Sequence, residues 1–255
     1  MRVRLVVNPH SRRGRRLGSR VREELERAGI EVVNADARTD AIVVAGGDGT
    51  LSRAIGPAID LNVPVGIVPL GTFNELARTL AIPSDVAQAC AAIAAGNTRT
   101  IDVARVNGAY YVNEASIGIS SRIARRQRSA DKQRWGVFAI LMSVLWIFAL
   151  WRRFRVEVAF DGTSEGLRAV QLTVANSHRF GGVVNVEGAA IDDGWLDLFC
   201  VEGMSLRGPV VRRYRSRAFA VTTRRPHRIS ADGEPAGRTP ARFEVVPGAL
   251  RVFAP

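Results

Sequence analysis

Lysine is almost absent from this chain of 255 residues, since Lys132 is the only one. A Walker A loop needs Gly-Lys-Ser/Thr, and a protein kinase needs a lysine on its third strand. Lys132 lies in Ser-Ala-Asp-Lys-Gln-Arg, far from any glycine-rich loop. The sequence therefore excludes both of these classes, and a phosphate would have to be bound by backbone amides, arginines or a metal ion.

Cysteine is also scarce, because Cys90 and Cys200 are the only two and cannot form a disulfide framework. Cys90 lies in an alanine-rich helical stretch and Cys200 ends an apolar strand pattern, so we expect both in the core. The chain starts Met-Arg-Val-Arg-Leu-Val-Val, which indicates a first strand rather than a signal peptide. We therefore expect a cytoplasmic protein.

Acidic residues are too few to balance the arginines, and the net charge is +12 with an isoelectric point near 11.2. Such a surface favours anionic partners such as nucleotides, anionic lipid head groups or nucleic acid. No recognisable nucleic-acid-reading motif accompanies the charge, so we expect no nucleic acid partner.

The first hundred residues alternate between strand and helix patterns. This alternation predicts a doubly wound parallel sheet, in which ligands bind beyond the carboxyl ends of the strands. Asn8, Asp48 and Thr72 each follow such an end. The predicted elements are strands 3–7, 31–34, 42–45 and 65–68, and helices 17–28, 51–59, 73–80 and 85–95.

The pattern changes after Asp102 to strands separated by Gly/Asn/Asp turns, which predicts an antiparallel β-sandwich-like domain. We expect an α/β domain over 1–102 and a β-rich domain over 103–242. The last segment, 243–255, contains a Pro247-Gly248 turn and is a candidate to return to the first domain. The strands predicted in the second domain are 103–118, 156–160, 169–175, 196–201 and 217–223.

One apolar run interrupts the strands, because Trp135 to Trp151 carries no charge and has arginines at both ends. Its 17 residues are at the lower limit for a membrane span. A buried helix, a helix on an anionic membrane surface and a true span all stay open, in that order of preference.

The most informative stretch is an apolar run, 42–45, that leads directly into Gly46-Gly47-Asp48-Gly49-Thr50. Glycines at the start of a helix let backbone N–H groups approach a phosphate. Asp48 could hold Mg²⁺ on a nucleotide or accept a proton from an attacking hydroxyl. A plain strand-to-helix turn would need neither the acid nor the threonine.

A second motif, Pro69-Leu70-Gly71-Thr72-Phe73-Asn74-Glu75, follows the next strand and should lie beside the first. The helix that starts after Thr72 offers further N–H groups to a phosphate. Thr72 and Glu75 could instead form a capping box, and both roles are compatible. The turn after the first strand, which begins Asn8-Pro9, is weak evidence by itself.

Together these motifs resemble the diacylglycerol kinase catalytic-domain family, which also contains sphingosine and ceramide kinases and bacterial lipid kinases. The resemblance runs nearly end to end, and the Gly-Gly-Asp-Gly-Thr and Asp-Gly-Glu motifs are its most specific parts. The later landmarks are Ile101-Asp102-Val103, the segment 111–118, Val174-Ala175-Asn176 with Gly181-Gly182, the segment 190–198 and Ala231-Asp232-Gly233-Glu234.

The resemblance implies an ATP-dependent lipid kinase that phosphorylates a lipid hydroxyl, with diacylglycerol as the default acceptor. Glu234 is the implied general base, with Asp48 beside it. Asp48 and Asp102 would organise Mg²⁺, and a further structural Mg²⁺ would be held by Asp193 with backbone oxygens of Ala190 and Trp195. ATP would lie between the domains, near Asn8, Thr39, Gly46, Gly47, Asp48, Gly49, Thr50, Gly71 and Thr72.

Several alternatives stay open at the level of sequence. Asp193-Gly194 and Asp232-Gly233 would also suit hairpin turns. NAD kinases share Gly-Gly-Asp-Gly-Thr, although the Gly71-Thr72 motif and Asp-Gly-Glu fit the lipid branch better. Residues 35–41 are fewer than the ~10–12 of a full crossover, which would suit a non-catalytic nucleotide or lipid sensor and weakens Thr39 as a nucleotide contact. Peripheral attachment to an anionic membrane is expected, and a homodimer is left open.

Overall fold

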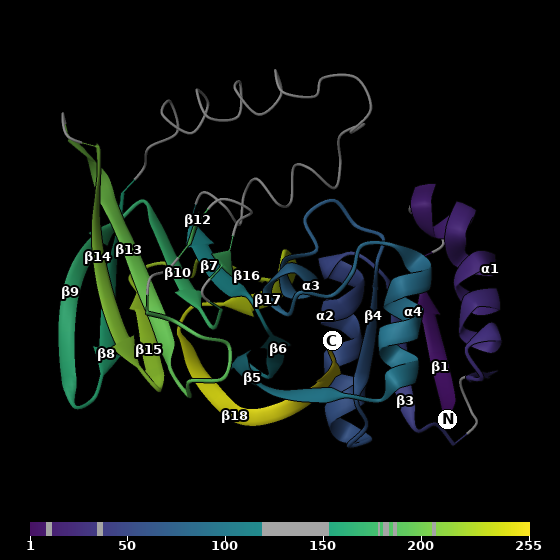
Figure 1. Cartoon of the computed structure of the whole chain (residues 1–255). Coiled ribbons are helices and arrows are strands. Elements are labelled where there is room, and N and C mark those ends of the chain that lie inside the picture. Colours follow the sequence, from purple (N-terminus) through teal and green to yellow (C-terminus); the bar gives the residue numbers. More distant parts are fainter. Residues whose placement is uncertain are drawn as a thin grey trace.

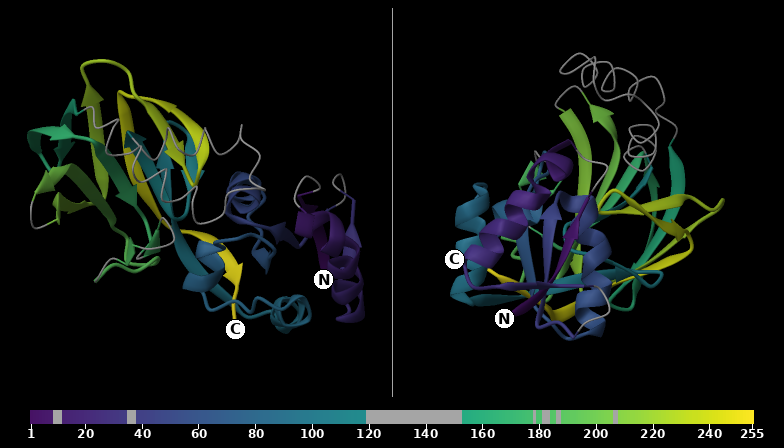
Figure 2. Two further views of the ribbon diagram at one scale, coloured as in Figure 1. Left: turned by 90° about the horizontal axis from the view of Figure 1, so that it is seen from above. Right: turned by 90° about the vertical axis from the view of Figure 1, so that its right-hand side faces the viewer.

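The computed structural model describes residues 1–8, 12–34, 38–118, 153–177, 179–180, 184–185, 188–205 and 208–255. An α/β part and a β-sandwich lie side by side (Figure 1), and two further views show the same division (Figure 2). The apolar run 135–151, Gly181 and Gly182 lie outside the described residues. Within the described residues, no helix is long and apolar enough to cross a membrane.

The α/β part is built on four parallel strands in the order β2-β1-β3-β4. Leu51 and Ile55 of α2 pack on one face of this sheet, and Leu25 of α1 and Ile93 of α4 pack on the other. This is the predicted doubly wound arrangement. The elements are β1 (Arg2–Val7), α1 (Arg12–Arg27), β2 (Glu31–Val33), β3 (Ala41–Gly46), α2 (Asp48–Asp60), β4 (Val65–Pro69), α3 (Glu75–Thr79) and α4 (Val86–Ala95).

The second part consists of antiparallel strands, as the turn-rich sequence predicts. One sheet has the order β14-β13-β10-β7-β16-β17, and β15, β8 and β9 extend the first sheet opposite it. Phe219, Phe243 and Tyr111 are buried in the core of this part. Its strands are β5 (Thr98–Val106), β6 (Ala109–Tyr111), β7 (Glu114–Gly118), β8 (Phe154–Phe160), β9 (Thr163–Ala169), β10 (Gln171–Ala175), β11 (Arg179–Phe180), β12 (Val184–Asn185), β13 (Leu196–Ser205), β14 (Gly208–Ser216), β15 (Ala218–Thr223), β16 (Arg228–Ala231) and β17 (Glu234–Arg238).

The last strand, β18 (Ala241–Phe253), runs along both parts of the molecule (Figure 1). It pairs with β15 and β5, and Val252 pairs in parallel with Val65 of β4. The expected turn at Pro247-Gly248 is instead an irregularity within one strand, because the register shifts between Val246 and Leu250. The sheet of the α/β part is therefore continuous with the sandwich through its last strand.

Candidate active site

Two glycine turns meet at the carboxyl ends of β3 and β4. The N–H of Leu70 donates to the carbonyl of Gly46 at 2.9 Å. A Cβ atom on Gly71 would lie 2.5 Å from the Cα of Gly47, so neither glycine can carry a side chain without moving a backbone. The fold therefore places the two motifs in direct contact, as their position after neighbouring strands in the sequence predicts.

The amino-terminal end of α2 lies at this junction. Its N-cap residue is Gly47, so the first N–H groups of the helix donate no hydrogen bond to a capping side chain. The first N–H groups of such a helix are suited to bind an anion. Thr50 is 4% exposed and its side chain packs over Gly46, so Thr50 belongs to the interior of the turn rather than to its surface.

Asp48 joins the two motifs through its carboxylate. It accepts hydrogen bonds from the backbone N–H groups of Asn74 at 3.0 Å and Glu75 at 2.7 Å. These groups form the start of α3, which begins at Glu75 rather than Phe73. The N-cap of α3 is Asn74 and not Thr72, so the capping-box alternative is wrong.

Asn74 fixes the turn that carries Gly71 and Thr72. Its backbone is left-handed, with φ of 48°. Its side-chain oxygen accepts from the N–H of Gly71 at 2.9 Å, and its side-chain nitrogen donates to the carbonyl of Gly71 at 3.1 Å. The turn is thus held by both its side chain and the carboxylate of Asp48.

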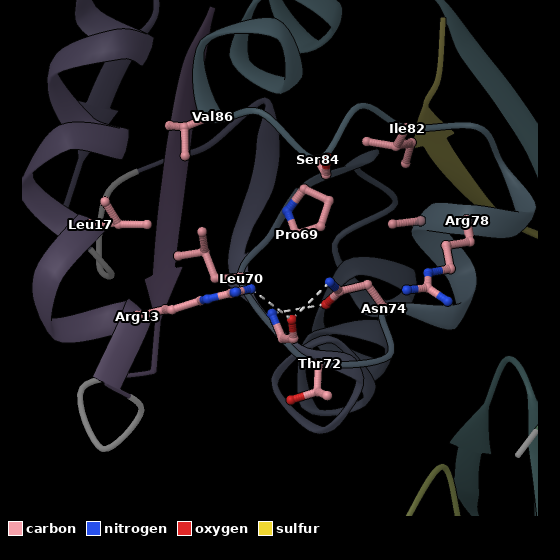
Figure 3. Close-up of a pocket in the computed structure, with 12 residues that line it drawn as sticks. Arg13, Leu17, Pro69, Leu70, Thr72, Asn74, Arg78, Ile82, Ser84 and Val86 are labelled. Atoms are coloured by element: carbon pink, nitrogen blue, oxygen red, sulfur yellow. Dashed lines mark hydrogen bonds between the residues drawn. The ribbon is translucent and has the colours of Figure 1, made fainter. Parts of the chain in front are cut away.

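A cavity of about 500 Å³ opens beside this turn, between α1, α3 and the start of α4 (Figure 3). Two arginines, Arg13 and Arg78, line it together with Thr72. The guanidinium of Arg13 donates to the carbonyl of Gly71 at 3.4 Å. Both arginines lie in or beside the sequence motifs, but neither was predicted as a site residue, although a chain with a single lysine has to rely on arginine for positive charge. The apolar lining is formed by Leu17, Pro69, Leu70, Ala77, Ile82 and Val86.

Glu234 reaches the same junction from the sandwich. It begins β17, directly after a two-residue turn in which Asp232 and Gly233 both have positive φ, 45° and 80°. Such a turn is typical of a tight hairpin, so the hairpin alternative for these residues is correct. A Cβ atom on Gly49 would lie 3.2 Å from Oε1 of Glu234. The hairpin therefore brings the proposed base to the amino-terminal end of α2.

Asp232 is held by three backbone N–H groups, which belong to Val112, Asn113 and Glu114. Burial raises the pKa of Asp232 to about 6, against the lowering effect of these three hydrogen bonds. The negative charge of Asp48 raises it further. The charge of Asp48 therefore acts on Asp232 across the boundary between the parts.

Glu114, at the start of β7, belongs to the same group of acids. Burial raises its pKa to about 8, and the charges of Glu75 and Asp232 add to the effect. Sequence reasoning missed Glu114 because it lies in a stretch expected to be a sandwich strand. Its signal was a carboxylate among small and apolar residues, Asn-Glu-Ala-Ser-Ile-Gly.

Asp102 does not contribute an open carboxylate to this group. It is 5% exposed, and its two oxygens accept from the N–H of Gly194 at 2.6 Å and of Gly248 at 2.8 Å. Its own N–H donates to the carbonyl of Ile191 at 2.8 Å. Asp102 thus ties the 188–195 loop to β18, and its expected role beside Asp48 stays a prediction.

The remaining sequence candidates, Asn8 and Thr39, lie at opposite ends of the parallel strands. Asn8 follows β1 at the carboxyl edge, level with Gly46, because Val7 pairs with Ala45. Thr39 precedes β3, and its hydroxyl donates to the carbonyls of Arg2 and Ala41. The short connection after β2 therefore leaves Thr39 at the opposite edge, away from the glycine turns.

Asp193 is surrounded by donors. Its carboxylate accepts from the N–H groups of Ala190 and Trp195, both at 2.9 Å, and pairs with the guanidinium of Arg215. Mg²⁺ is bound by oxygen ligands, whereas the groups that contact the Asp193 carboxylate here are nitrogen donors and one of them is a cation. The residues present therefore do not fit the structural Mg²⁺ site that the sequence resemblance implies.

Two family models match the chain. Residues 2–106 match the diacylglycerol kinase catalytic domain. Residues 113–208 and 200–254 match the YegS C-terminal NAD kinase beta sandwich-like domain. The matches follow the two parts of the fold.

Similar proteins carry a corresponding name. A diacylglycerol kinase of Staphylococcus saprophyticus is 27% identical over 293 residues, covering 100% of this chain and 95% of that protein. One from Staphylococcus epidermidis is 26% identical and covers 100% and 92%. A crystal structure from Bacillus anthracis, 23% identical, has a TM-score of 0.81 and covers 100% of this chain and 95% of that one. This last likeness concerns the fold.

Proposed function

The chain belongs to the diacylglycerol kinase catalytic-domain family and is a lipid kinase, and on that premise we propose that it transfers the γ-phosphoryl group of ATP to the hydroxyl of diacylglycerol. The contact between Gly49 and Glu234 is the observation that carries this proposal. It joins a phosphate-binding helix end to a carboxylate from the other part of the molecule.

The proposal assigns the nucleotide to the glycine turns. The uncapped N–H groups of α2 receive the phosphates, and Thr72 follows Gly71 in the turn that contacts Gly47. Arg13 and Arg78 supply positive charge from the adjoining cavity, which has apolar walls suited to a nucleoside. Gly47 and Gly71 allow the phosphates to approach the backbone closely.

Glu234 is the proposed general base. Its carboxylate accepts the proton of the lipid hydroxyl as the hydroxyl oxygen attacks the γ-phosphorus and ADP leaves. Phosphoryl transfer depends mainly on positioning and charge neutralisation, and a well-placed base adds roughly 10²–10⁴-fold. Asp48 holds the two glycine turns in register for this attack.

The carboxylates at the junction suit the Mg²⁺ that accompanies ATP in phosphoryl transfer. Burial is the main cause of the raised pKa values of Glu114 and Asp232, and the charges of neighbouring carboxylates raise both values further. When bound, Mg²⁺ would neutralise this charge and that of the phosphates. We assign its protein ligand to Asp48, which is only half-buried and whose oxygens each keep a lone pair beside the N–H group that they accept, with Glu75 and Asp232 nearby. Asp102 is left out of the set because it is buried.

The experiment that tests the proposal measures transfer of labelled phosphate from ATP. Diacylglycerol, a sphingoid base and phosphatidylglycerol in mixed micelles should be compared with NAD in solution. We expect phosphatidic acid as the main product, and loss of it in the Glu234→Gln variant. Phosphorylated NAD without a phosphorylated lipid would overturn the proposal, whereas another lipid product would correct only the acceptor.

We also propose that the enzyme works at an anionic membrane surface. Its net charge is +12, and Phe73, beside the site, is 57% exposed although the turn that carries it is held on both sides. An exposed aromatic residue on a chain with this excess of positive charge suits an anionic lipid interface.

Vesicle binding tests this attachment. Phe73→Ala should weaken binding to vesicles that contain anionic lipid, while Leu61→Ala, a matched change of an exposed apolar residue after α2, should not. Equal binding of the two variants would contradict the assignment of Phe73.

A further inference from the structure

The loop formed by residues 188–195 joins the sandwich to the α/β part. It leads into β13, and its Ile191 is buried in the core that α2 shares with the first sheet. Asp102 binds the loop through the N–H of Gly194 and the carbonyl of Ile191. The conformation of this loop therefore affects how the two parts are held together.

A guanidinium closes the other side of the loop. Arg215, on β14, donates through Nη1 to the carbonyl of Gly188 at 2.9 Å, and through Nη2 to Oδ2 of Asp193. One cationic group thus bridges a backbone carbonyl and a carboxylate of the same loop. A carbonyl and a carboxylate are also the kinds of oxygen that a divalent cation would join.

The other hydrogen-bond donors at Asp193 also argue against a bound cation. Both of its oxygens already accept backbone N–H groups, from Ala190 and Trp195. An N–H group presents positive charge, which repels a cation, whereas a carboxylate with such donors and an arginine is well satisfied. The charge of Asp193 is therefore balanced within the chain.

Arg215 has a fixed position on β14. It lies opposite Asp197 of β13 in the sheet register, while Arg213, two residues earlier, forms the ion pair with Asp197. Residues two apart on a strand share a face. Arg213 is thus a matched neighbour that serves a different acid.

We propose that Arg215 takes the place of a structural divalent cation in the 188–195 loop, so that this chain holds the loop, and through Asp102 the junction between its two parts, without a metal ion. The proposal concerns folding and not catalysis. It goes beyond the proposed kinase activity and does not depend on it.

Thermal unfolding without nucleotide tests the proposal. In the presence of EDTA, Arg215→Ala should lower the melting temperature by about 2–4 °C. Arg215→Lys keeps the charge but not the planar guanidinium, so its melting temperature should lie between those of the wild type and Arg215→Ala. An unchanged melting temperature of Arg215→Ala in EDTA would overturn the proposal.

Addition of Mg²⁺ gives an independent readout. Carboxylates at the active site can bind Mg²⁺ by themselves, so the quantity to compare is the Mg²⁺-induced shift in the wild type and in Asp193→Asn. We expect equal shifts, because the loop binds none of the ion, and Arg213→Ala should also keep the wild-type shift. A smaller shift in Asp193→Asn would show that the loop binds Mg²⁺ and would overturn the proposal.

Discussion

Replacement of Glu114 by glutamine should stabilise the protein at high pH and reduce the dependence of its stability on pH. The folded protein raises the pKa of this carboxyl group from 4.5 to about 8, through burial first and then through Glu75 and Asp232. Between these two values the folded state binds more protons than the unfolded chain. The free energy of unfolding must therefore fall as pH rises through this window.

The magnitude follows from the same numbers. At roughly 1.4 kcal/mol for each pH unit, a pKa of about 8 in place of 4.5 corresponds to a total loss on the order of 5 kcal/mol, most of it between about pH 4.5 and about pH 8. Glutamine has a similar shape and no charge, so the unfolding free energy of Glu114→Gln should not show this loss as pH rises. Asp232, whose pKa rises from 3.8 to about 6, adds a loss of the same sign at lower pH in both proteins.

Urea unfolding at a series of pH values measures the effect, without nucleotide or divalent cation. The wild type and Glu114→Gln should have similar stability at about pH 5 and should diverge by about pH 8.5. Glu23→Gln, an exposed change on α1, is the control and should follow the wild type. Parallel curves for Glu114→Gln and the wild type would refute the reasoning, because they would show that Glu114 is ionised at no cost in the folded state.

Three further predictions concern the active site. Glu234→Gln should lower kcat by roughly 10²–10⁴-fold with little change in unfolding free energy, and near-normal turnover would exclude Glu234 as the base. Asp48→Asn should cost about 1–3 kcal/mol in stability as well as activity, since one of its two bonds to the start of α3 is lost; unchanged urea unfolding would contradict this link. Arg13→Ala should raise the KM for ATP more than kcat changes, while Arg20→Ala, an exposed arginine on the same helix, should leave both unchanged. Equal kinetics of these two variants would remove Arg13 from the nucleotide site.

Much of the fold could be predicted from the sequence because its signals are local. Apolar runs that lead into glycine-containing turns marked β3 and β4, and the strand–helix alternation indicated the parallel sheet. The sequence analysis did not identify β14, Gly-Pro-Val-Val-Arg-Arg-Tyr-Arg-Ser, as a strand. Its arginines are used in ion pairs with Glu202, Asp197 and Asp193, and such partners are distant in sequence.

The site was only partly predictable, because a motif fixes a residue type but not the partner of its side chain. Asp48 has the expected position, yet its bonds to Asn74 and Glu75 depend on how α3 starts. Asp102 is conspicuous in sequence, and only the folded loop shows that both of its oxygens are occupied. Thr39 fails for a simpler reason, since a connection too short for a helix leaves it before a strand rather than after one.

The pairing of β18 has a consequence for synthesis on the ribosome. The strand beside β4 is β18, residues 241–253, although β4 itself ends at Pro69. While the chain is being made, β4 keeps an open edge, which is a hazard for pairing between nascent chains. The sheet of the α/β part can be completed only after almost the entire chain has emerged. A prematurely terminated product should therefore be a substrate for proteases rather than an unregulated nucleotide-binding fragment.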